Sequence, residues 1–316
     1  MSIFLNILFL IIGMALLIKG ADFFVSGASA LAKRLRIPSL IIGLTIVAIG
    51  TSLPELVISV TSALKGSADM SVGNIIGSNI FNTFLILGVV SFFTTINISK
   101  DVRKLDLPIL FIITTLFCAL GTNGLNRFEC IYMLIIFISY IYKLVTNAKR
   151  DSQIQLDTGT EIKDYKIWQI VLLLIGGISM VILGGEFAST TATSLAISFG
   201  MSEALVGLTI LAVGTSLPEL VTSVIAIKKG ENDIALGNVI GSNIANILLI
   251  LGLVGTISPI NVSTVILTDM VILTVTTCFF YLLCNKFDSL NKKHSYILIM
   301  IYVMYLIFTI VRNYCF

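Results

Sequence analysis

The chain contains the same octapeptide twice: GTSLPELV stands at 50–57 and again at 214–221. The identity extends further, because roughly 26 of the 41 residues from Gly43 to Thr83 equal the residue 164 positions later. Repetition over such a length indicates an internal duplication in which each copy is one structural unit. The chain must therefore fold as two related halves.

Both copies lie in strongly apolar surroundings. Hydrophobic residues make up 57% of the 316 residues, charged residues only 12%, and the mean hydropathy is +1.04, whereas soluble domains carry about 25% charged residues. Several apolar runs reach the roughly 18 residues that span a bilayer. We predict an all-α polytopic membrane protein with about ten transmembrane helices, at 3–32, 38–64, 70–93, 107–123, 128–146, 167–198, 202–227, 232–256, 264–284 and 295–313.

A polar segment separates these helices into two groups of five. It covers 147–166, which we interpret as a linker between a first repeat, 1–146, and a second repeat, 167–316. Because five is an odd number, the second half enters the membrane from the opposite side, so the repeats are inverted. Inverted repeats are typical of secondary transporters, whose substrate site lies near the bilayer midplane.

The loop charges predict the orientation, because short cytoplasmic loops are rich in Lys and Arg. With the N-terminus outside, most cations fall in cytoplasmic loops, and the external loops keep only Lys65, Arg127 and Arg312. We therefore expect both termini outside, 147–166 in the cytoplasm and the protein in the plasma membrane. The net charge of +3 follows from this arrangement. It gives no support for nucleic-acid binding, and no protein partner is evident.

Two glutamates, Glu55 and Glu219, are the acids placed most deeply in apolar segments, one in each octapeptide. A charge at the bilayer centre costs about 2.5–3.5 kcal/mol on insertion scales, so such acids usually face a cavity or a partner. A structural hydrogen bond, or a helix-end acid that reaches water, is the simpler interpretation. However, no cationic residue lies near either in sequence, and two acids that meet near a twofold axis need a cation or protons to offset their repulsion.

Oxygen atoms surround each glutamate. The residue before it, Pro54 or Pro218, lacks an N–H and opens the preceding helical turn. We therefore expect free carbonyl oxygens over 48–51 and 212–215, although a plain kink is the alternative. The hydroxyls expected on the same face belong to Thr51, Ser52, Ser59 and Ser62, and to Thr215, Ser216 and Ser223.

A second duplicated segment supplies further oxygen, in GNIIGSNIFN at 73–82 and GNVIGSNIAN at 237–246. Helical spacing places three polar residues of each copy on one stripe, namely Asn74, Ser78 and Asn82, and Asn238, Ser242 and Asn246. Each copy also has a GxxxG pair, which allows close helix packing. Interhelical hydrogen bonding is the alternative role for the Ser and Asn residues.

The resulting donor set contains carboxylates, hydroxyls, amide oxygens and carbonyls, without thiolate or imidazole. Ca²⁺ takes six to eight such oxygen ligands, and two negative charges match one Ca²⁺ or two Na⁺. The single histidine, His294, stands in a polar loop, and the five cysteines lack metal-site spacing. Competition of two ions for the same carboxylates would couple their opposite flows.

Two other pairs of acids also correspond across the repeats. Asp22 and Glu186 lie within the long first helices, and we interpret them as acids that reach interfacial water, with a role in an access path as the alternative. Asp69 and Asp233 each lie near a lysine, and we expect them to be loop charges that cap the following helix.

Together, GTSLPELV with GNIIGSNIFN, duplicated as GTSLPELV with GNVIGSNIAN, resembles the alpha repeats of sodium/calcium exchangers in the calcium/cation antiporter superfamily. The resemblance covers essentially the whole chain, which is similar to compact microbial members of the family. It implies an alternating-access antiporter, not an enzyme and without a cofactor, that moves Ca²⁺ against several Na⁺ through one shared site. It also implies that two long helices, 3–32 and 167–198, slide against the other eight.

The same resemblance implies a ligand set around Glu55 and Glu219. Its other members are the side chains of Thr51, Ser52, Ser78, Thr215, Ser216 and Ser242, the backbone oxygens of Ala48 and Ala212, and a central amide pair, Asn82 and Asn246. Many relatives carry an aspartate at the place of Asn246. Its replacement here removes one titratable group and leaves K⁺ dependence or proton binding there without support.

Other functions stay open at this point. The first is exchange of Ca²⁺, or another divalent cation, for H⁺; proton-coupled relatives typically have an acid after the Gly-Asn of the second motif, where this chain has GNIIGSN. A passive channel would conduct one ion without exchange. An intramembrane hydrolase needs a metal or a nucleophile–base pair, for which neither octapeptide offers a neighbouring His, Lys or Arg.

Overall fold

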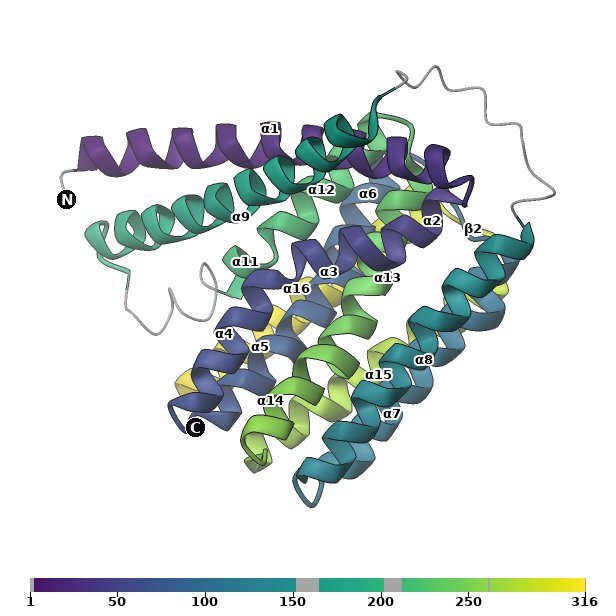
Figure 1. Ribbon diagram of the computed structural model, residues 1–316. Helices are drawn as coiled ribbons and strands as arrows, with labels where there is room; N and C mark the ends of the chain where they lie inside the picture. The colour runs from purple at the N-terminus through teal and green to yellow at the C-terminus, as the bar shows by residue number, and fades with distance from the viewer. Residues whose placement is uncertain (1–2, 152–164, 202–211, 261, 316) are drawn as a thin grey trace.

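The computed structural model describes residues 3–151, 165–201, 212–260 and 262–315, and these are almost entirely helical, as predicted (Figure 1). The first half contains α1 (Ile3–Leu35), α2 (Ser39–Ile42), α3 (Ala48–Thr51), α4 (Leu53–Leu64), α5 (Ala68–Ile80), α6 (Leu87–Phe93), β1 (Ile96–Asn97), α7 (Leu107–Gly121) and α8 (Arg127–Asp151). The second half contains α9 (Ile167–Ser198), α11 (Ala212–Thr215), α12 (Leu217–Lys228), α13 (Asn232–Ala245), α14 (Leu251–Ile257), α15 (Thr264–Lys286), β2 (Ser289–Leu290) and α16 (Lys292–Cys315). Short π-helical turns at Gly43–Val47, Phe81–Ile86, Val102–Asp106 and Asn246–Ile250 join or precede several of these helices.

The described residues contain eight helices long and apolar enough to cross a bilayer, or nine if the bent pair Ser39–Thr51 and Leu53–Leu64 is one span. These correspond to nine of the ten predicted spans. The tenth, 202–227, begins outside the described residues, which resume at α11. The helix α8 continues to Asp151, so the predicted linker 147–166 starts with helical residues, and its centre at 152–164 also lies outside the description.

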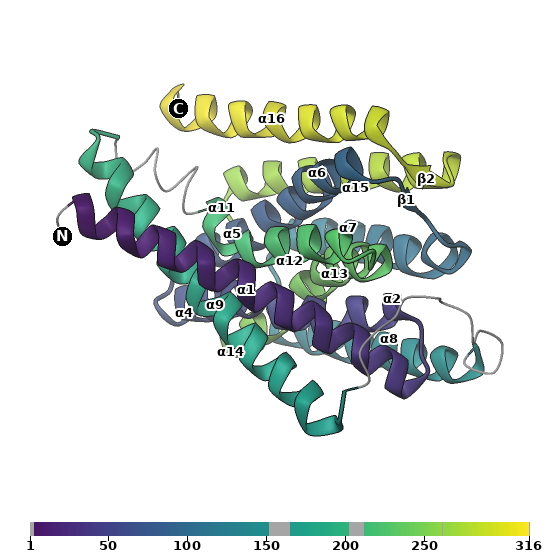
Figure 2. The ribbon, with the colours of Figure 1, turned by 90° about the horizontal axis from the view of Figure 1, so that it is seen from above.

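The helices α1 and α9 correspond to each other in the duplication and lie side by side in opposite directions (Figures 1 and 2). Close approaches show this directly: a Cβ added to Gly20 would lie 2.7 Å from the Val181 nitrogen, and one added to Gly184 would lie 2.5 Å from the Leu17 nitrogen. At 33 and 32 residues these helices are about 50 Å long, so a bilayer core of about 30 Å requires them to tilt. An inverted repeat predicts that corresponding helices of the two halves run in opposite directions, as α1 and α9 do.

The two segments with the Ser/Asn stripes form the centre of the bundle. In each of the spans Ala68–Phe93 and Asn232–Ile257, 78% of the most apolar stretch is buried, whereas the figure is 22% for α1, α9 and α16. Their polar side chains are therefore enclosed by protein. Glycines permit the closest packing here, because a Cβ on Gly241 would lie 2.5 Å from the Leu44 carbonyl oxygen.

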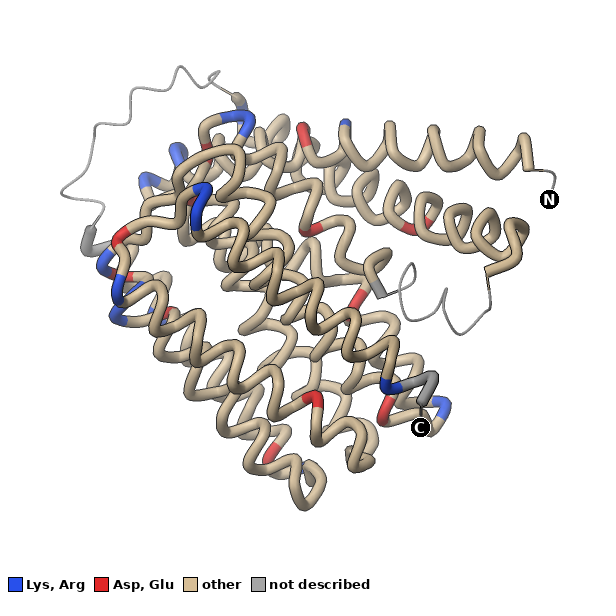
Figure 3. Tube along the Cα trace, turned by 180° about the vertical axis from the view of Figure 1, so that it is seen from behind, with Lys and Arg blue, Asp and Glu red and all other residues tan. Residues whose placement is uncertain are grey.

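Backbone contacts tie the loops of the two halves together. The strands β1 and β2 pair antiparallel, with Ile96 opposite Leu290, and Leu125 pairs with Ile260 in a separate bridge. Figure 3 shows Lys and Arg gathered mainly toward one end of the bundle, so the charge asymmetry of the sequence is also an asymmetry in space. That this end is cytoplasmic stays a prediction.

Candidate functional site

The glutamates stand where a helix is broken and restarted. In the first half, α3 ends at Thr51 and the chain bends by 46° before α4. Pro54 occupies the first turn of α4, where a missing N–H costs no helical bond. Consequently Glu55 lies in the first turn of α4, and Glu219 lies in the first turn of α12. The unpaired N–H groups of a first turn favour negative charge.

The structure corrects one expectation about this break. The Ala48 carbonyl was expected to be free, but it accepts the backbone N–H of Ser52 at 3.1 Å and the Ser242 hydroxyl at 3.3 Å. The chain bends after this bond and not before it, so the last turn of α3 stays closed. The Ala48 oxygen nevertheless faces the hydroxyl of another predicted ligand. The corresponding Ala212 begins α11, at the edge of the described residues.

Each carboxylate is bound by the serine of the opposite half. The Ser52 hydroxyl donates to Glu219 Oε1 at 3.1 Å. The Ser216 hydroxyl donates to Glu55 Oε1 at 3.0 Å, and Ser78 reaches the same oxygen at 3.4 Å. Both glutamates are fully buried. The two octapeptides are thus interlocked, and their acids share one buried region.

One threonine and two asparagines complete the surroundings. The Thr51 hydroxyl donates to Asn238 Oδ1 in the other half at 3.0 Å. The Asn238 amide donates to the Glu219 backbone oxygen at 3.3 Å, and the Asn74 amide donates to the Glu55 backbone oxygen at 3.4 Å. Each of these asparagines also donates to a serine of the neighbouring helix, at 3.0 Å in both halves. The stripe residues therefore fix the glutamate-bearing helices.

Several buried oxygens nevertheless have no hydrogen-bond partner among the described residues. They are Oε2 of Glu55 and of Glu219 and the amide oxygens of Asn82 and Asn246. A buried acceptor left unpaired costs about 1–3 kcal/mol, and more if it is charged. Such atoms gathered from both halves are the arrangement that a bound cation would satisfy.

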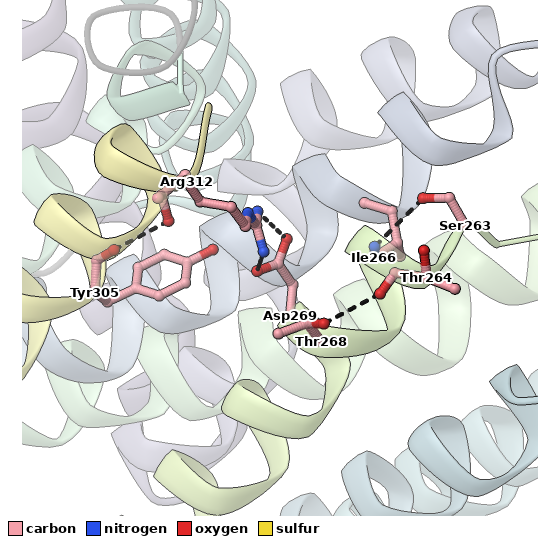
Figure 4. A network of polar contacts seen from close by, with 8 residues as sticks. Ser263, Thr264, Ile266, Thr268, Asp269, Tyr305 and Arg312 are labelled. Carbon is pink, nitrogen blue, oxygen red and sulfur yellow. Dashed lines mark hydrogen bonds and ion pairs between the residues drawn. The ribbon is translucent and has the colours of Figure 1, made fainter. Parts of the chain in front are cut away.

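Two other buried acids in the spans, Asp269 and Asp106, have their own partners away from the octapeptides. The Asp269 carboxylate receives two hydrogen bonds from the Arg312 guanidinium, at 2.8 and 2.9 Å (Figure 4). The Tyr140 hydroxyl donates to Asp106 at 2.9 Å. No Lys or Arg pairs with Glu55 or Glu219 among the described residues. Glu55 and Glu219 are the most deeply buried acids among the described residues, and their side-chain partners there are hydroxyls and not cations.

The helices α1 and α9 border this site at the first glycine of each octapeptide. A Cβ on Gly50 would lie 2.9 Å from the Phe24 ring, and one on Gly214 would lie 2.1 Å from the Ser189 hydroxyl. Only glycine fits at both places without displacement of a side chain of the neighbouring helix. The antiparallel helix pair therefore packs directly on the two helix breaks.

The structure brings together most of the predicted ligand residues, from α3, α4 and α5 in one half and α11, α12 and α13 in the other. Two further asparagines, Asn79 and Asn243, were not predicted for the site although the duplicated GSN motif contains them. The Asn246 amide donates to Asn79 Oδ1 at 2.9 Å, and the Asn79 amide donates to the Asn243 backbone oxygen at 3.2 Å. They connect the two stripes across the centre of the bundle.

A family model described as sodium/calcium exchanger protein matches residues 5–146 and 169–311 of this chain. The chain belongs to the sodium/calcium exchanger family. The resemblance of the duplicated motifs is thereby confirmed, and cation/Ca²⁺ antiport is the activity that this membership supports.

Relatives of this exchanger-family chain match it over most of its length. It is 42% identical to the putative antiporter CaxA of Alkalimonas amylolytica over 79% of this chain and 80% of that protein. It is 31% identical to the sodium/calcium exchanger MaX1 of Methanosarcina acetivorans over 96% and 97%. A solved structure of the sodium-calcium exchanger NCX_Mj, soaked with Na⁺ and Sr²⁺, superposes with a TM-score of 0.84 at 29% identity, over 96% of this chain and 98% of that one.

Proposed function

We propose that this exchanger-family chain exchanges Ca²⁺ for Na⁺ by alternating access, with both ions competing for one buried site centred on Glu55 and Glu219. The observation that carries the proposal is the crossed pair of serine–glutamate hydrogen bonds, which holds two carboxylates from opposite halves in one enclosed region. Each carboxylate keeps one oxygen, Oε2, without a partner among the described residues.

Charge and donor chemistry support a hard cation. Two carboxylates balance one Ca²⁺ or two Na⁺, so the two ions are alternatives for the same charge. Ca²⁺ accepts six to eight oxygens in flexible geometry. The proposed ligands are the carboxylates of Glu55 and Glu219, the hydroxyls of Thr51, Ser52, Ser78, Thr215, Ser216 and Ser242, the backbone oxygens of Ala48 and Ala212, and the amide oxygens of Asn82 and Asn246. Na⁺ would use the hydroxyls and carbonyls at the edges of this set.

Proton exchange fits the geometry less well. A protonated carboxyl group is a donor and needs an acceptor. Oε2 of each glutamate has no partner among the described residues, so a proton on that oxygen would lack an acceptor there. A metal ion needs only acceptor oxygens and can satisfy both Oε2 atoms at once.

Calcium isotope uptake into proteoliposomes tests the function. Gradients of Na⁺, K⁺ and H⁺ are applied one at a time, and we expect uptake to follow the Na⁺ gradient alone. Uptake driven equally by a pH gradient would instead establish H⁺/Ca²⁺ exchange. Conductance without a counter-ion would establish a channel.

We further propose that the chain lies in the plasma membrane with both termini outside and 147–166 in the cytoplasm. The support is the gathering of Lys and Arg mainly at one end of the bundle. Single-cysteine variants in a cysteine-free background, placed in 147–166 and at the C-terminus, should be labelled from opposite sides of intact cells. Labelling of the 147–166 cysteine by an impermeant reagent outside would overturn this orientation.

A further inference from the structure

The central amide pair is not equivalent in the two halves. Asn246 donates its amide to Asn79 Oδ1 at 2.9 Å and keeps its own oxygen unpartnered among the described residues. In its mate, Asn82, neither the amide nitrogen nor the oxygen has a partner among them. Both side chains are fully buried. One amide is therefore held in a defined orientation, and the other is not.

A difference in sequence explains the asymmetry. The Asn243 amide donates to the Thr83 hydroxyl at 2.7 Å. The position equivalent to Thr83 in the second half is Ile247, which has no hydroxyl. The Asn79 amide therefore donates to a backbone oxygen, that of Asn243, and this leaves its own side-chain oxygen facing Asn246.

We propose that Asn79 is a positioning residue that turns the side-chain oxygen of Asn246 toward the transported cation. The proposal rests on the function proposed above. Because Asn79 Oδ1 can only accept, Asn246 must present its NH₂ group to it. The oxygen of Asn246 is then fixed on the other side as a neutral ligand that needs no reorientation when a cation arrives.

The test compares Asn79→Leu, which deletes both hydrogen bonds of the Asn79 side chain, with Thr83→Val, which deletes the one that Thr83 accepts in the same buried network. We expect Asn79→Leu to raise the half-saturating Ca²⁺ concentration about tenfold with a nearly unchanged maximal rate, because the cation must then orient the amide. Thr83→Val should shift it less than threefold. The thermal unfolding midpoint in detergent should fall more in Asn79→Leu, which loses one hydrogen bond more than Thr83→Val.

Equal shifts of half-saturation in the two variants, or a fall in maximal rate alone, would overturn the positioning role. Wild-type exchange is measured in the same vesicles. If the wild type shows no Na⁺-driven Ca²⁺ uptake, the proposed function fails and not the role of Asn79.

An independent observation concerns the contact of α1 with the loop between α12 and α13. The Lys229 ammonium lies 2.8 Å from Asp22 Oδ1 and donates to the Ser26 hydroxyl at 2.6 Å. One turn further along α1, Ser29 donates to Glu231. An ion pair and two hydroxyl bonds thus join one end of α1 to the bundle.

The duplicated positions carry the same charges but do not make the same contact. Glu186 on α9 corresponds to Asp22, and Lys65 corresponds to Lys229. Glu186 and Lys65 are exposed, and neither forms an ion pair with a described residue. Thr193, the mate of Ser29, has a buried hydroxyl without a partner among the described residues.

We infer that Asp22–Lys229 and Glu186–Lys65 are alternating ion pairs, of which the first closes one end of the transporter here and the second forms when the opposite end closes. This inference also rests on the proposed antiport. In inverted repeats the opposite-facing state arises when the two halves exchange conformations. The repeat mate of a contact made in one state is therefore made in the other.

Lys229→Gln and Lys65→Gln form a matched pair of tests in vesicles of known orientation. A partly exposed ion pair contributes little, so the expected change is about threefold. Lys229→Gln should lower the half-saturating Ca²⁺ concentration at the face where α12 ends and raise it at the other face. Lys65→Gln should do the reverse, and the exchanged pair Asp22→Lys with Lys229→Asp should restore the wild-type ratio.

If the half-saturating Ca²⁺ concentrations shifted in the same direction in both variants, or the exchanged pair did not restore the wild-type ratio, the inference of alternating ion pairs would be overturned. Uptake driven by Na⁺ at unchanged maximal rate in these variants would leave the proposed function standing.

Discussion

Replacing Ser52 with alanine tests the crossed arrangement of the two octapeptides. The substitution deletes the 3.1 Å hydrogen bond to Glu219, a buried acid in the other half, and leaves the acid of its own octapeptide, Glu55, untouched. A hydrogen bond to a charged group contributes about 1.5–3 kcal/mol. Since about 1.4 kcal/mol corresponds to a tenfold change, Ca²⁺ affinity should fall roughly 10- to 100-fold.

A double-mutant cycle separates this bond from a general disturbance of the site. Glu219→Asp keeps the charge but withdraws the carboxylate from Ser52, whereas Glu55→Asp makes the same change in the carboxylate that Ser52 does not contact. Calorimetric Ca²⁺ titration of the purified protein should give a coupling of at least about 1 kcal/mol for Ser52 with Glu219 and under about 0.5 kcal/mol with Glu55. Stronger coupling within the octapeptide than between octapeptides would refute the crossed pairing.

Two further predictions address the site and the helix pair. Glu55→Gln and Glu219→Gln should each abolish exchange while the protein still inserts, because one of the two charges that balance Ca²⁺ is lost; robust Na⁺-driven uptake in both variants would contradict the site. Gly184→Ala should destabilise the protein by about 1–3 kcal/mol, because the added Cβ would lie 2.5 Å from backbone of α1, whereas Gly176→Ala in the same helix meets no described atom within 4 Å. Thermal unfolding in detergent compares the two, and equal midpoints would count against the close packing of α1 on α9.

The sequence predicted the features that depend on period and repetition. Apolar run length located the nine described spans, because the bilayer fixes how many residues a spanning helix needs. The duplication identified Glu55 and Glu219 as equivalent positions. The octapeptide also located the helix breaks, since proline belongs at the start of a helix and not in its interior. These signals are local, so one chain was enough to find them.

The contacts between the halves could not be predicted in the same way. Helical spacing places Ser52 beside its own Glu55, yet its hydroxyl binds the acid of the other half. The carbonyl of Ala48 was expected to be free and is bonded, because the last turn of α3 stays closed and the chain bends only after Thr51. Asn79 was overlooked since its role depends on a partner 167 residues away. Periodicity carries no information about such pairings.

Two identical octapeptides in inverted halves would give two states of equal free energy if the rest of the chain were also identical. The preference for one state must therefore come from positions at which the halves differ. Ser67 stands where the second half has Glu231, the partner of Ser29. The contact around Asp22–Lys229 and the one proposed around Glu186–Lys65 therefore differ in their hydrogen bonds, although each pair consists of an acid and a lysine. The duplicated octapeptides can then remain identical for ion binding, while the differing loops determine which end of the transporter is closed at rest.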